Sequence, residues 1–275
     1  MVTEKQIFKQ GYFILREAKI EDAEFDAKQL FEFCFNHKVV IPLVDAEATN
    51  DEVNEKYIAL CKRRANREPL QYLLGFWEFF SLPFKVSNDV LIPRPDTEVL
   101  VETALKYINK NNIVYDFCTG SGCIGITLAH ECNCKAVLFD ISEKALNIAK
   151  ENALLNKVKV SFEHLDILKE TPDIPCDVLV CNPPYLTEDE MNSLQQELKF
   201  EPSLALYGGN DGLTFYKALA TLQAKALKTN GYMILEIGET QAHDIIDIFV
   251  KNRFDFTELI KDYSGNDRVL VFRKI

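Results

Sequence analysis

The chain has 275 residues, 47% hydrophobic and 27% charged, which suits one large domain, or an ordinary domain plus a small one. Its formal net charge of -11 disfavours nonspecific binding to DNA or RNA. The N-terminus, MVTEKQIFKQ, lacks an apolar core, and no apolar run approaches the ~20 residues of a membrane span. We therefore expect neither a signal peptide nor a membrane span, and we predict a cytoplasmic protein.

The eight cysteines show no metal-binding pattern. None form a CxxC pair, and Cys132 and Cys134 have the wrong spacing for a zinc knuckle. Several lie inside apolar runs, where a free thiol behaves as a small hydrophobic side chain. We predict reduced cysteines and no metal site.

Residues 1–75 are predicted to form a small all-helical domain. FDAKQLFEFCF (25–35) has apolar residues at helical spacing. The segment 49–68 opens with capping and acidic residues and closes with basic ones, which suits a helix dipole. The basic cluster at its end indicates either a solvated helix end or a contact with an acidic partner. This cluster contains Lys62, Arg63, Arg64 and Arg67.

Residues 76–95 are predicted to form a β-hairpin linker. FWEFFSLPFKVSNDVLI (76–92) is aromatic and β-branched, and it is broken at Pro83 and at residues 87–89. The segment 92–110 then enters a helix, for which Asp96 and Thr97 supply a cap.

Residues 96–275 are predicted to form one α/β domain. Seven strand candidates are visible: IVYDF, KAVLFD, VKVSFEH, DVLVC, GYMILEIG, FDFTELIKD and RVLVFRKI. Helices fit between most of them, at 122–131, 142–156, 211–228 and 239–252. This alternation predicts a mostly parallel sheet with helices on both faces. The last two strands are joined by only YSGND (263–267), so they should form an antiparallel hairpin at one edge.

A small-residue turn, CTGSG (118–122), follows the first of these strands and precedes a helix. Gly120 and Gly122 would let the backbone approach a ligand closely, and the helix N-terminus offers free N–H groups. Asp140 ends the next strand, where its carboxylate could accept both ribose hydroxyls of an adenosine. Because residues 120–125 also match GxGxxG, both NAD and S-adenosylmethionine remain candidates. Asp116 favours the latter, since it could face the ammonium group of a methionine moiety.

The motif Asn182-Pro183-Pro184-Tyr185 follows the strand DVLVC (177–181). Two consecutive prolines cannot lie inside a helix or a central strand, so they fix a rigid strand exit. The Asn182 amide and a proline carbonyl could accept the two N–H bonds of a planar NH2 group, and Tyr185 offers an aromatic face to it and to a sulfonium. These residues predict methylation of a planar nitrogen. The alternative is a loop that merely ends the strand.

Together these motifs resemble the HemK/PrmC family of protein-(glutamine-N5) methyltransferases. REPLQYLLG (67–75) and LIPRPDTEVLVE (91–102) are similar to the family's interdomain segment. The blocks similar to its catalytic domain are DFCTGSG, FDIS, CNPPY, EPSLALYGGNDGL, LEIGETQ and KDYSGNDRVLV. NPPY alone also occurs in nucleic-acid amino-methyltransferases, whereas its combination with IPRPDTE and GGNDGL is far more specific.

The resemblance implies a helical substrate-recognition domain, a β-hairpin linker and a Rossmann-like, seven-stranded methyltransferase domain. It also implies that the methyl donor is S-adenosylmethionine, with S-adenosylhomocysteine as product, and that the acceptor is the GGQ glutamine of peptide chain release factors. The implied cofactor contacts are Cys118, Thr119, Gly120, Ser121, Gly122, Asp140, Ile141, Asp166, Ile167 and Asn182. Residues Asn182 to Tyr185 would hold the glutamine and form the catalytic site.

The sequence departs from the family pattern at two of these positions. The family usually has a glycine where Cys118 stands, so a side chain could crowd the methionine end of the cofactor. Ile167 stands where some members have an aromatic residue beside the adenine.

Three other functions would account for part of these motifs. A nucleic-acid N6-adenine or N4-cytosine methyltransferase would use NPPY in the same way on a flipped base, but the net charge of -11 opposes it. An NAD-dependent enzyme leaves NPPY unexplained. A non-catalytic scaffold would require that Cys118 has spoiled the cofactor turn.

Overall fold

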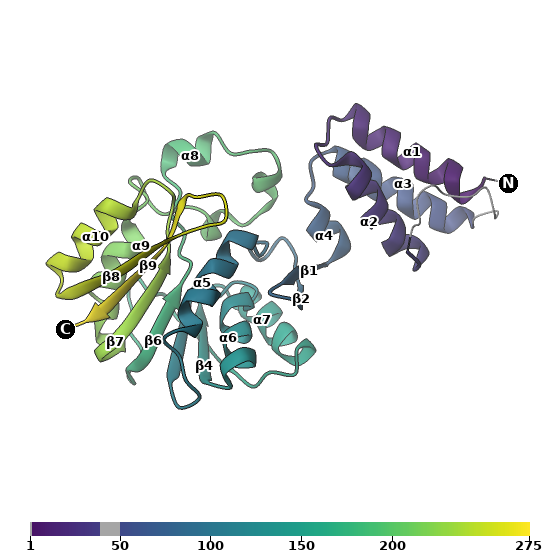
Figure 1. Cartoon of the computed structure of the whole chain (residues 1–275). Coiled ribbons are helices and arrows are strands. Elements are labelled where there is room, and N and C mark those ends of the chain that lie inside the picture. Colours follow the sequence, from purple (N-terminus) through teal and green to yellow (C-terminus); the bar gives the residue numbers. More distant parts are fainter. Residues whose placement is uncertain (1, 39–49) are drawn as a thin grey trace. The chain divides into compact units, whose positions relative to one another are not determined.

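The computed structural model describes residues 2–38 and 50–275, which divide into two compact units (Figure 1). The first unit contains residues 1–75 together with Gln195–Phe200, and the second contains Phe76–Leu194 and Glu201–Ile275. Residue 49, with which one predicted helix opens, lies outside the described residues.

The first unit is helical. Its helices are α1 (Glu4–Glu17), α2 (Ala23–Phe35), α3 (Asp51–Ala65) and α4 (Leu70–Leu74). Helix α1 begins with a capping box between Thr3 and Gln6, and α3 begins where the Asn50 side chain accepts from the Glu52 backbone N–H. Phe31 and Tyr57 are fully buried and pack edge to face at a ring-centroid distance of 5.3 Å.

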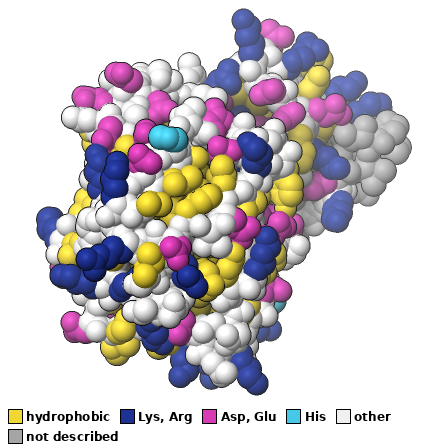
Figure 2. All heavy atoms as spheres, turned by 60° about the vertical axis from the view of Figure 1, so that its left-hand side comes forward, with side chains coloured by type: hydrophobic (Ala, Val, Ile, Leu, Met, Phe, Trp, Pro, Cys, Tyr) yellow, Lys and Arg dark blue, Asp and Glu magenta, His cyan; other side chains and the backbone are white. Residues whose placement is uncertain are grey.

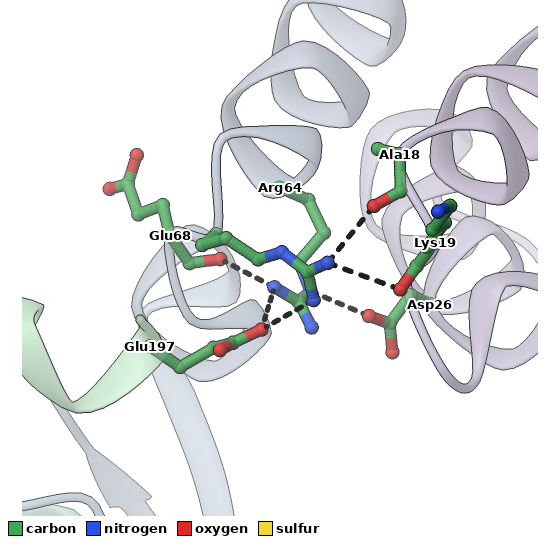
Figure 3. A network of polar contacts seen from close by, with 7 residues as sticks. Ala18, Lys19, Asp26, Arg64, Glu68 and Glu197 are labelled. Atoms are coloured by element: carbon green, nitrogen blue, oxygen red, sulfur yellow. Dashed lines mark hydrogen bonds and ion pairs between the residues drawn. The ribbon is translucent and has the colours of Figure 1, made fainter. Parts of the chain in front are cut away.

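A polar network, which we call the Arg64–Glu197 network, joins residues 195–200 to the helices (Figure 3). The Arg64 guanidinium binds Asp26 at 2.6 Å and Glu197 at 3.3 Å. Arg67 also binds Glu197, at 3.2 Å, and donates to the carbonyl oxygens of Ala18 and Lys19. Part of the predicted basic cluster therefore binds acidic groups of the chain itself.

The second unit is built on a seven-stranded sheet of order β5-β4-β3-β6-β7-β9-β8. The strands are β3 (Ile113–Phe117), β4 (Lys135–Asp140), β5 (Ser161–His164), β6 (Cys176–Cys181), β7 (Leu227–Glu236), β8 (Phe254–Lys261) and β9 (Asp267–Lys274). Strands β5, β4, β3, β6 and β7 pair in parallel, whereas β9 is antiparallel to both of its neighbours. The separate hairpin of β1 (Phe76–Phe79) and β2 (Leu82–Lys85) belongs to the same unit.

Helices cover both faces of this sheet (Figure 1). They are α5 (Pro95–Leu105), α6 (Cys123–Cys132), α7 (Glu143–Leu155), α9 (Thr214–Ala220) and α10 (Ala242–Lys251). The short helix α8 (Glu188–Asn192) has no buried residue and belongs to neither layer. Neighbouring strand residues alternate between two cores. Val178 and Val180 pack with residues of α5 and α6, whereas Leu179 and Cys181 pack with residues of α9 and α10. The predicted Rossmann-like fold is confirmed.

Several predicted elements differ from the structure. Asp96 and Thr97 do not cap the helix as predicted, because α5 already begins at Pro95 and its N-cap residue is Arg94. The strand predicted from residue 158 begins only at Ser161. The helix predicted over 211–228 is shorter, since α9 spans Thr214–Ala220, a 3-10 turn spans Gln223–Ala226, and β7 begins at Leu227. Gly209 and Gly212 have positive φ angles of 94° and 70°, which a right-handed helix excludes, so the helix starts after them.

Among residues 2–38 and 50–275, no helix has the length and apolar character needed to cross a membrane.

Gly11 of α1 provides a test of packing in the first unit. A Cβ atom at this position would overlap the ring of Tyr57, which is fully buried and donates its hydroxyl to the carbonyl oxygens of Phe8 and Ala27. We expect Gly11→Ala to lower the free energy of unfolding by about 1–3 kcal/mol, the usual cost of overpacking. Helix propensity alone would act the other way, by up to ~1 kcal/mol.

Urea denaturation followed by circular dichroism measures this effect, with Gln10→Ala on the exposed side of α1 as the control. If Gly11→Ala is as stable as the control, the described contact with Tyr57 is wrong.

Candidate active site

A cavity lies at the carboxyl ends of β3, β4 and β6, where parallel strands gather their loops at one edge of the sheet. Eight of the predicted site residues line it: Cys118, Gly120, Asp140, Ile141, Asp166, Ile167, Asn182 and Pro184. The other predicted residues, Asp116, Thr119, Ser121, Gly122, Pro183 and Tyr185, lie around it without lining it. The structure therefore brings the turn, the Asp140 region and the NPPY motif to one cavity.

Backbone hydrogen bonds hold the turn at residues 118–122 in place. The Thr119 N–H donates to the Phe139 carbonyl at 3.0 Å, and the Gly122 N–H donates to the Thr119 carbonyl at 2.8 Å. Cys118 has a φ angle of 57°, in the left-handed region that glycine adopts most easily. The space beside Gly120 is open, so the cavity reaches the backbone there.

Asp140 joins the turn to the end of β4. One of its carboxylate oxygens accepts from the Gly120 N–H at 2.8 Å, and the other accepts from the Ser142 N–H at 2.9 Å. Burial raises the pKa of Asp140, and these backbone donors oppose the rise. Each oxygen keeps one lone pair for a ligand in the cavity.

Asp116 lies beneath the turn and is fully buried. Its Oδ2 accepts from the Thr119 hydroxyl and from the Gly125 N–H, while Oδ1 is buried with no hydrogen-bond partner among the described residues. Burial raises the pKa of this carboxyl to about 7. Asp116 thus supports the turn from below, and its predicted contact with a methionine ammonium stays a prediction.

The NPPY motif leaves the sheet where β6 ends. Cys181 is the last residue of β6, and it pairs with Phe117 of β3 and Leu235 of β7. Asn182 follows at the cavity wall, and its Nδ2 donates to the Thr97 hydroxyl oxygen at 3.4 Å. Tyr185 lines a second, polar cavity instead, and burial raises its pKa to about 12.

The segment after the motif is held by residues to which sequence reasoning assigned no role. The Leu186 N–H donates to the Leu206 carbonyl at 2.9 Å, and the Gly208 N–H donates to the Leu186 carbonyl at 2.8 Å. A Cβ atom on Gly208 would come within 2.6 Å of the Tyr185 Cα, so only glycine permits this approach. The Gln241 side chain also donates to the Tyr185 carbonyl at 3.1 Å.

Glu201 is another residue whose role the sequence did not reveal. Its side chain is 1% exposed, pairs with the Arg94 guanidinium and accepts from the Ile92 N–H at 3.1 Å. It therefore ties IPRPDTE to the segment that supplies Pro202 and Leu204 to the cavity. The only signal was that both stretches belong to blocks typical of the HemK/PrmC family.

The end of β7 places another acid beside the motif. Glu236 is 3% exposed, and burial raises its pKa to about 7, although polar contacts with Thr97 and Asn182 and the charge of Arg268 oppose the rise. Its Oε2 has no hydrogen-bond partner among the described residues.

Figure 2 shows one face of the molecule, on which Lys and Arg side chains are interspersed with Asp and Glu side chains and small hydrophobic patches. The charges on this face are therefore mixed, without a continuous basic stripe.

Two family models match this chain. Residues 6–75 match the PrmC N-terminal domain, and residues 94–203 match the methyltransferase small domain. The chain is 38% identical to a release factor glutamine methyltransferase of Fusobacterium nucleatum subsp. nucleatum, over 98% of this chain and 78% of that protein. It is 36% identical to one of Clostridium botulinum, over 98% and 99%.

A solved structure, a methyltransferase from Pyrococcus furiosus, has a TM-score of 0.57 to this chain and 19% identity, and the match covers 71% of this chain and 90% of that one. The fold and the matched domain define the protein as a Rossmann-like methyltransferase. The chain belongs to the HemK/PrmC family of protein-(glutamine-N5) methyltransferases.

The left-handed backbone at Cys118 generates a prediction. A residue with a Cβ atom costs about 1–2 kcal/mol in this conformation, and glycine loses part of that advantage through its greater freedom in the unfolded chain. We expect Cys118→Gly to unfold with a free energy about 0.5–1 kcal/mol higher than Cys118→Ala.

Alanine is the matched control because it removes the thiol and keeps the Cβ atom. Equal stability of the two variants in urea denaturation would mean that the turn is not strained at this position.

Proposed function

We propose that the protein transfers a methyl group from S-adenosylmethionine to the side-chain amide nitrogen of the glutamine in the GGQ motif of peptide chain release factors, in the cytoplasm. The observation that carries this proposal is the position of Asn182 and Pro184 on the wall of the cavity that the 118–122 turn and Asp140 also border. The names of relatives at 36–38% identity over 98% of the chain support the choice of substrate.

The residues around the cavity fit S-adenosylmethionine. The Asp140 carboxylate suits the ribose hydroxyls, Ile167 and Leu168 supply apolar contacts for a base, and the open space beside Gly120 suits the methionine part. When bound, the cofactor supplies an electrophilic methyl group on a sulfonium. We propose no metal for this reaction.

The chain's own part in the reaction is to position the acceptor nitrogen. An amide nitrogen is a poor nucleophile, because its lone pair is delocalised into the carbonyl group. The Asn182 Oδ1 and the carbonyl oxygen of a proline in the motif would accept its two N–H bonds and hold it in line with the methyl group. Such positioning can lower a barrier by ~7–11 kcal/mol.

No strong base is needed before the attack. Methylation makes the nitrogen acidic, so its proton can leave to water afterwards. Glu188, Asp189 and Glu190 follow the motif, but they form the first turn of α8, where Glu190 closes a capping box with Thr187.

A nucleic-acid amino-methyltransferase is the second candidate, because NPPY could hold a flipped base in the same way. The net charge of -11 speaks against nucleic acid as the substrate. Transfer of labelled methyl groups to release factor, but not to DNA or ribosomal RNA, would separate the two functions. Binding of S-adenosylhomocysteine but not NAD would eliminate the NAD-dependent alternative, and methyl transfer would eliminate the non-catalytic scaffold.

Asp140 generates a prediction about cofactor binding. Asp140→Ala removes both acceptors for the ribose and the contact with the Gly120 N–H. We expect S-adenosylhomocysteine to bind on the order of 2–3 kcal/mol more weakly, which is roughly 30–150-fold in Kd. Calorimetric titration measures this loss, and Asp166→Ala, which removes another carboxylate of the cavity wall, one that pairs with Lys169 at 2.7 Å, gives the comparison. Unchanged affinity in Asp140→Ala would remove this residue from the cofactor site.

Asn182 generates a prediction about the chemical step. Asn182→Ala should leave the fold intact and lower the single-turnover rate of methyl transfer to release factor by roughly 100-fold or more, as loss of a preorganised polar group does elsewhere. Binding of S-adenosylhomocysteine should weaken only modestly. We expect Asn182→Asp, which keeps an acceptor oxygen, to be more active than Asn182→Ala. Transfer by Asn182→Ala at the wild-type rate would contradict the mechanism.

A further inference from the structure

The orientation of the Asn182 side-chain amide has to be set by its surroundings. The oxygen and nitrogen of an amide are nearly equal in size, so packing alone does not distinguish the two orientations. If Asn182 is to accept an N–H bond from the substrate glutamine, its Oδ1 must face the cavity and its Nδ2 must face the protein. This requirement rests on the proposed function.

The sheet places Glu236 next to Asn182. Cys181, the last residue of β6, pairs with Leu235 of β7, so Asn182, which follows β6, lies beside Glu236, the last residue of β7. The Glu236 backbone is fixed on its other side by pairing with Val269, and its carbonyl accepts from the Tyr216 hydroxyl at 3.0 Å. Glu236 therefore has a defined position beneath the NPPY exit.

The hydrogen bond between Asn182 and Thr97 has a defined donor and a defined acceptor. The Asn182 Nδ2 donates to the Thr97 Oγ1 at 3.4 Å, and Thr97 is 2% exposed. The Thr97 hydroxyl accepts from Asn182 and can donate its own O–H to a second acceptor, and the Glu236 carboxylate makes polar contacts with both Thr97 and Asn182. An ionised carboxylate can only accept hydrogen bonds, so neighbouring side chains turn their donor atoms toward it.

We propose that Glu236, acting directly and through Thr97, fixes the Asn182 side-chain amide with Nδ2 toward the protein and Oδ1 toward the substrate glutamine. Glu236 and Thr97 do not line the cavity, so they are positioning residues. The buried Oε2 of Glu236 has no hydrogen-bond partner among the described residues, and an unsatisfied buried oxygen of this kind costs folding free energy. A positioning role for the carboxylate accounts for that cost.

The variant Glu236→Gln tests the proposal, because it keeps the shape of the side chain and gives it an amide that can donate to the Asn182 Oδ1. With saturating S-adenosylmethionine and release factor, we expect its single-turnover rate to fall tenfold or more. The Kd of S-adenosylhomocysteine should stay within twofold of the wild type, because Glu236 does not border the cofactor cavity.

A second pair of variants, both at Thr97, tests the proposal even if Glu236→Gln fails to fold. Thr97→Val removes the hydroxyl with little change in shape and should also lower the rate, whereas Thr97→Ser keeps the hydroxyl and should retain most of it. A merely structural role for Thr97 would make the serine variant, with its smaller side chain, at least as damaging as the valine variant.

A double-mutant cycle separates positioning from an independent role. Because Glu236 acts through Asn182, adding Glu236→Gln to Asn182→Ala should change the residual rate by less than twofold. Additive losses would overturn the proposal, as would a wild-type rate in Glu236→Gln. If the wild-type protein itself does not methylate release factor, the proposed function fails first, and that outcome is distinct from a normal rate in the variant.

The pH dependence of the single-turnover rate supplies a readout that packing would not give. The amide is held only when Glu236 is ionised, so the rate should rise as the pH increases through about 7 and flatten in Glu236→Gln. The other charged or titratable groups that face Glu236 are Asp96, Cys123, Tyr185, Tyr216 and Arg268. Cys123 and Tyr185 stay neutral near pH 7, since burial raises the pKa of each to about 12.

The pH profile of Glu236→Gln is needed as a comparison, because burial also raises the pKa of Asp116 to about 7 and Asp116 could cause a similar rise in rate. A rise through pH 7 that persists unchanged in Glu236→Gln would belong to another group and would overturn the proposal.

Discussion

The parallel pairing of β3 with β6 is the constraint on which the site depends. Register places Phe117 opposite Cys181, so the residues that follow them leave the sheet side by side. The turn that begins at Cys118 and the motif that begins at Asn182 are separated by more than sixty positions in the chain, yet this one ladder makes them neighbours. A slip of one residue would turn the alternate side chains of β6 from one core to the other, so burial on both faces fixes the register.

Two buried carboxyls, Asp116 and Glu236, lie under the two halves of the site. Each has an oxygen without a partner among the described residues, and burial raises the pKa of each to about 7. Burial disfavours the ionised form of both groups in the folded state. Their contribution to the free energy of unfolding is therefore fully present below the pKa of the unfolded chain, and it is lost as the pH rises through about 7. Ionising these two groups therefore lowers the free energy of unfolding of the chain.

Much of the fold could be predicted because its signals are local. The apolar runs IVYDF and DVLVC became β3 and β6, and the short YSGND connection led correctly to an antiparallel hairpin at the sheet edge. The residues that brace the motif could not be predicted, since Glu201, Gly208 and Gln241 act through contacts with residues far away in sequence. The late start of α9 has the same cause. Gly208 and Gly212, which precede this helix, pack against the backbone of Tyr185, and local helix propensity does not predict such a contact between distant residues.

The Arg64–Glu197 network has a consequence for synthesis on the ribosome. Its basic residues, Arg64 and Arg67, follow helix α2, and Glu197 lies 130 positions after Arg67. At ~5–20 residues per second, translation needs on the order of ten seconds to cover that distance. Throughout this interval the helices exist without the Gln195–Phe200 segment, and Arg64 has only Asp26 among its acidic partners. Although the helical unit is made first, it is completed only after β3, β4, β5 and β6 have emerged.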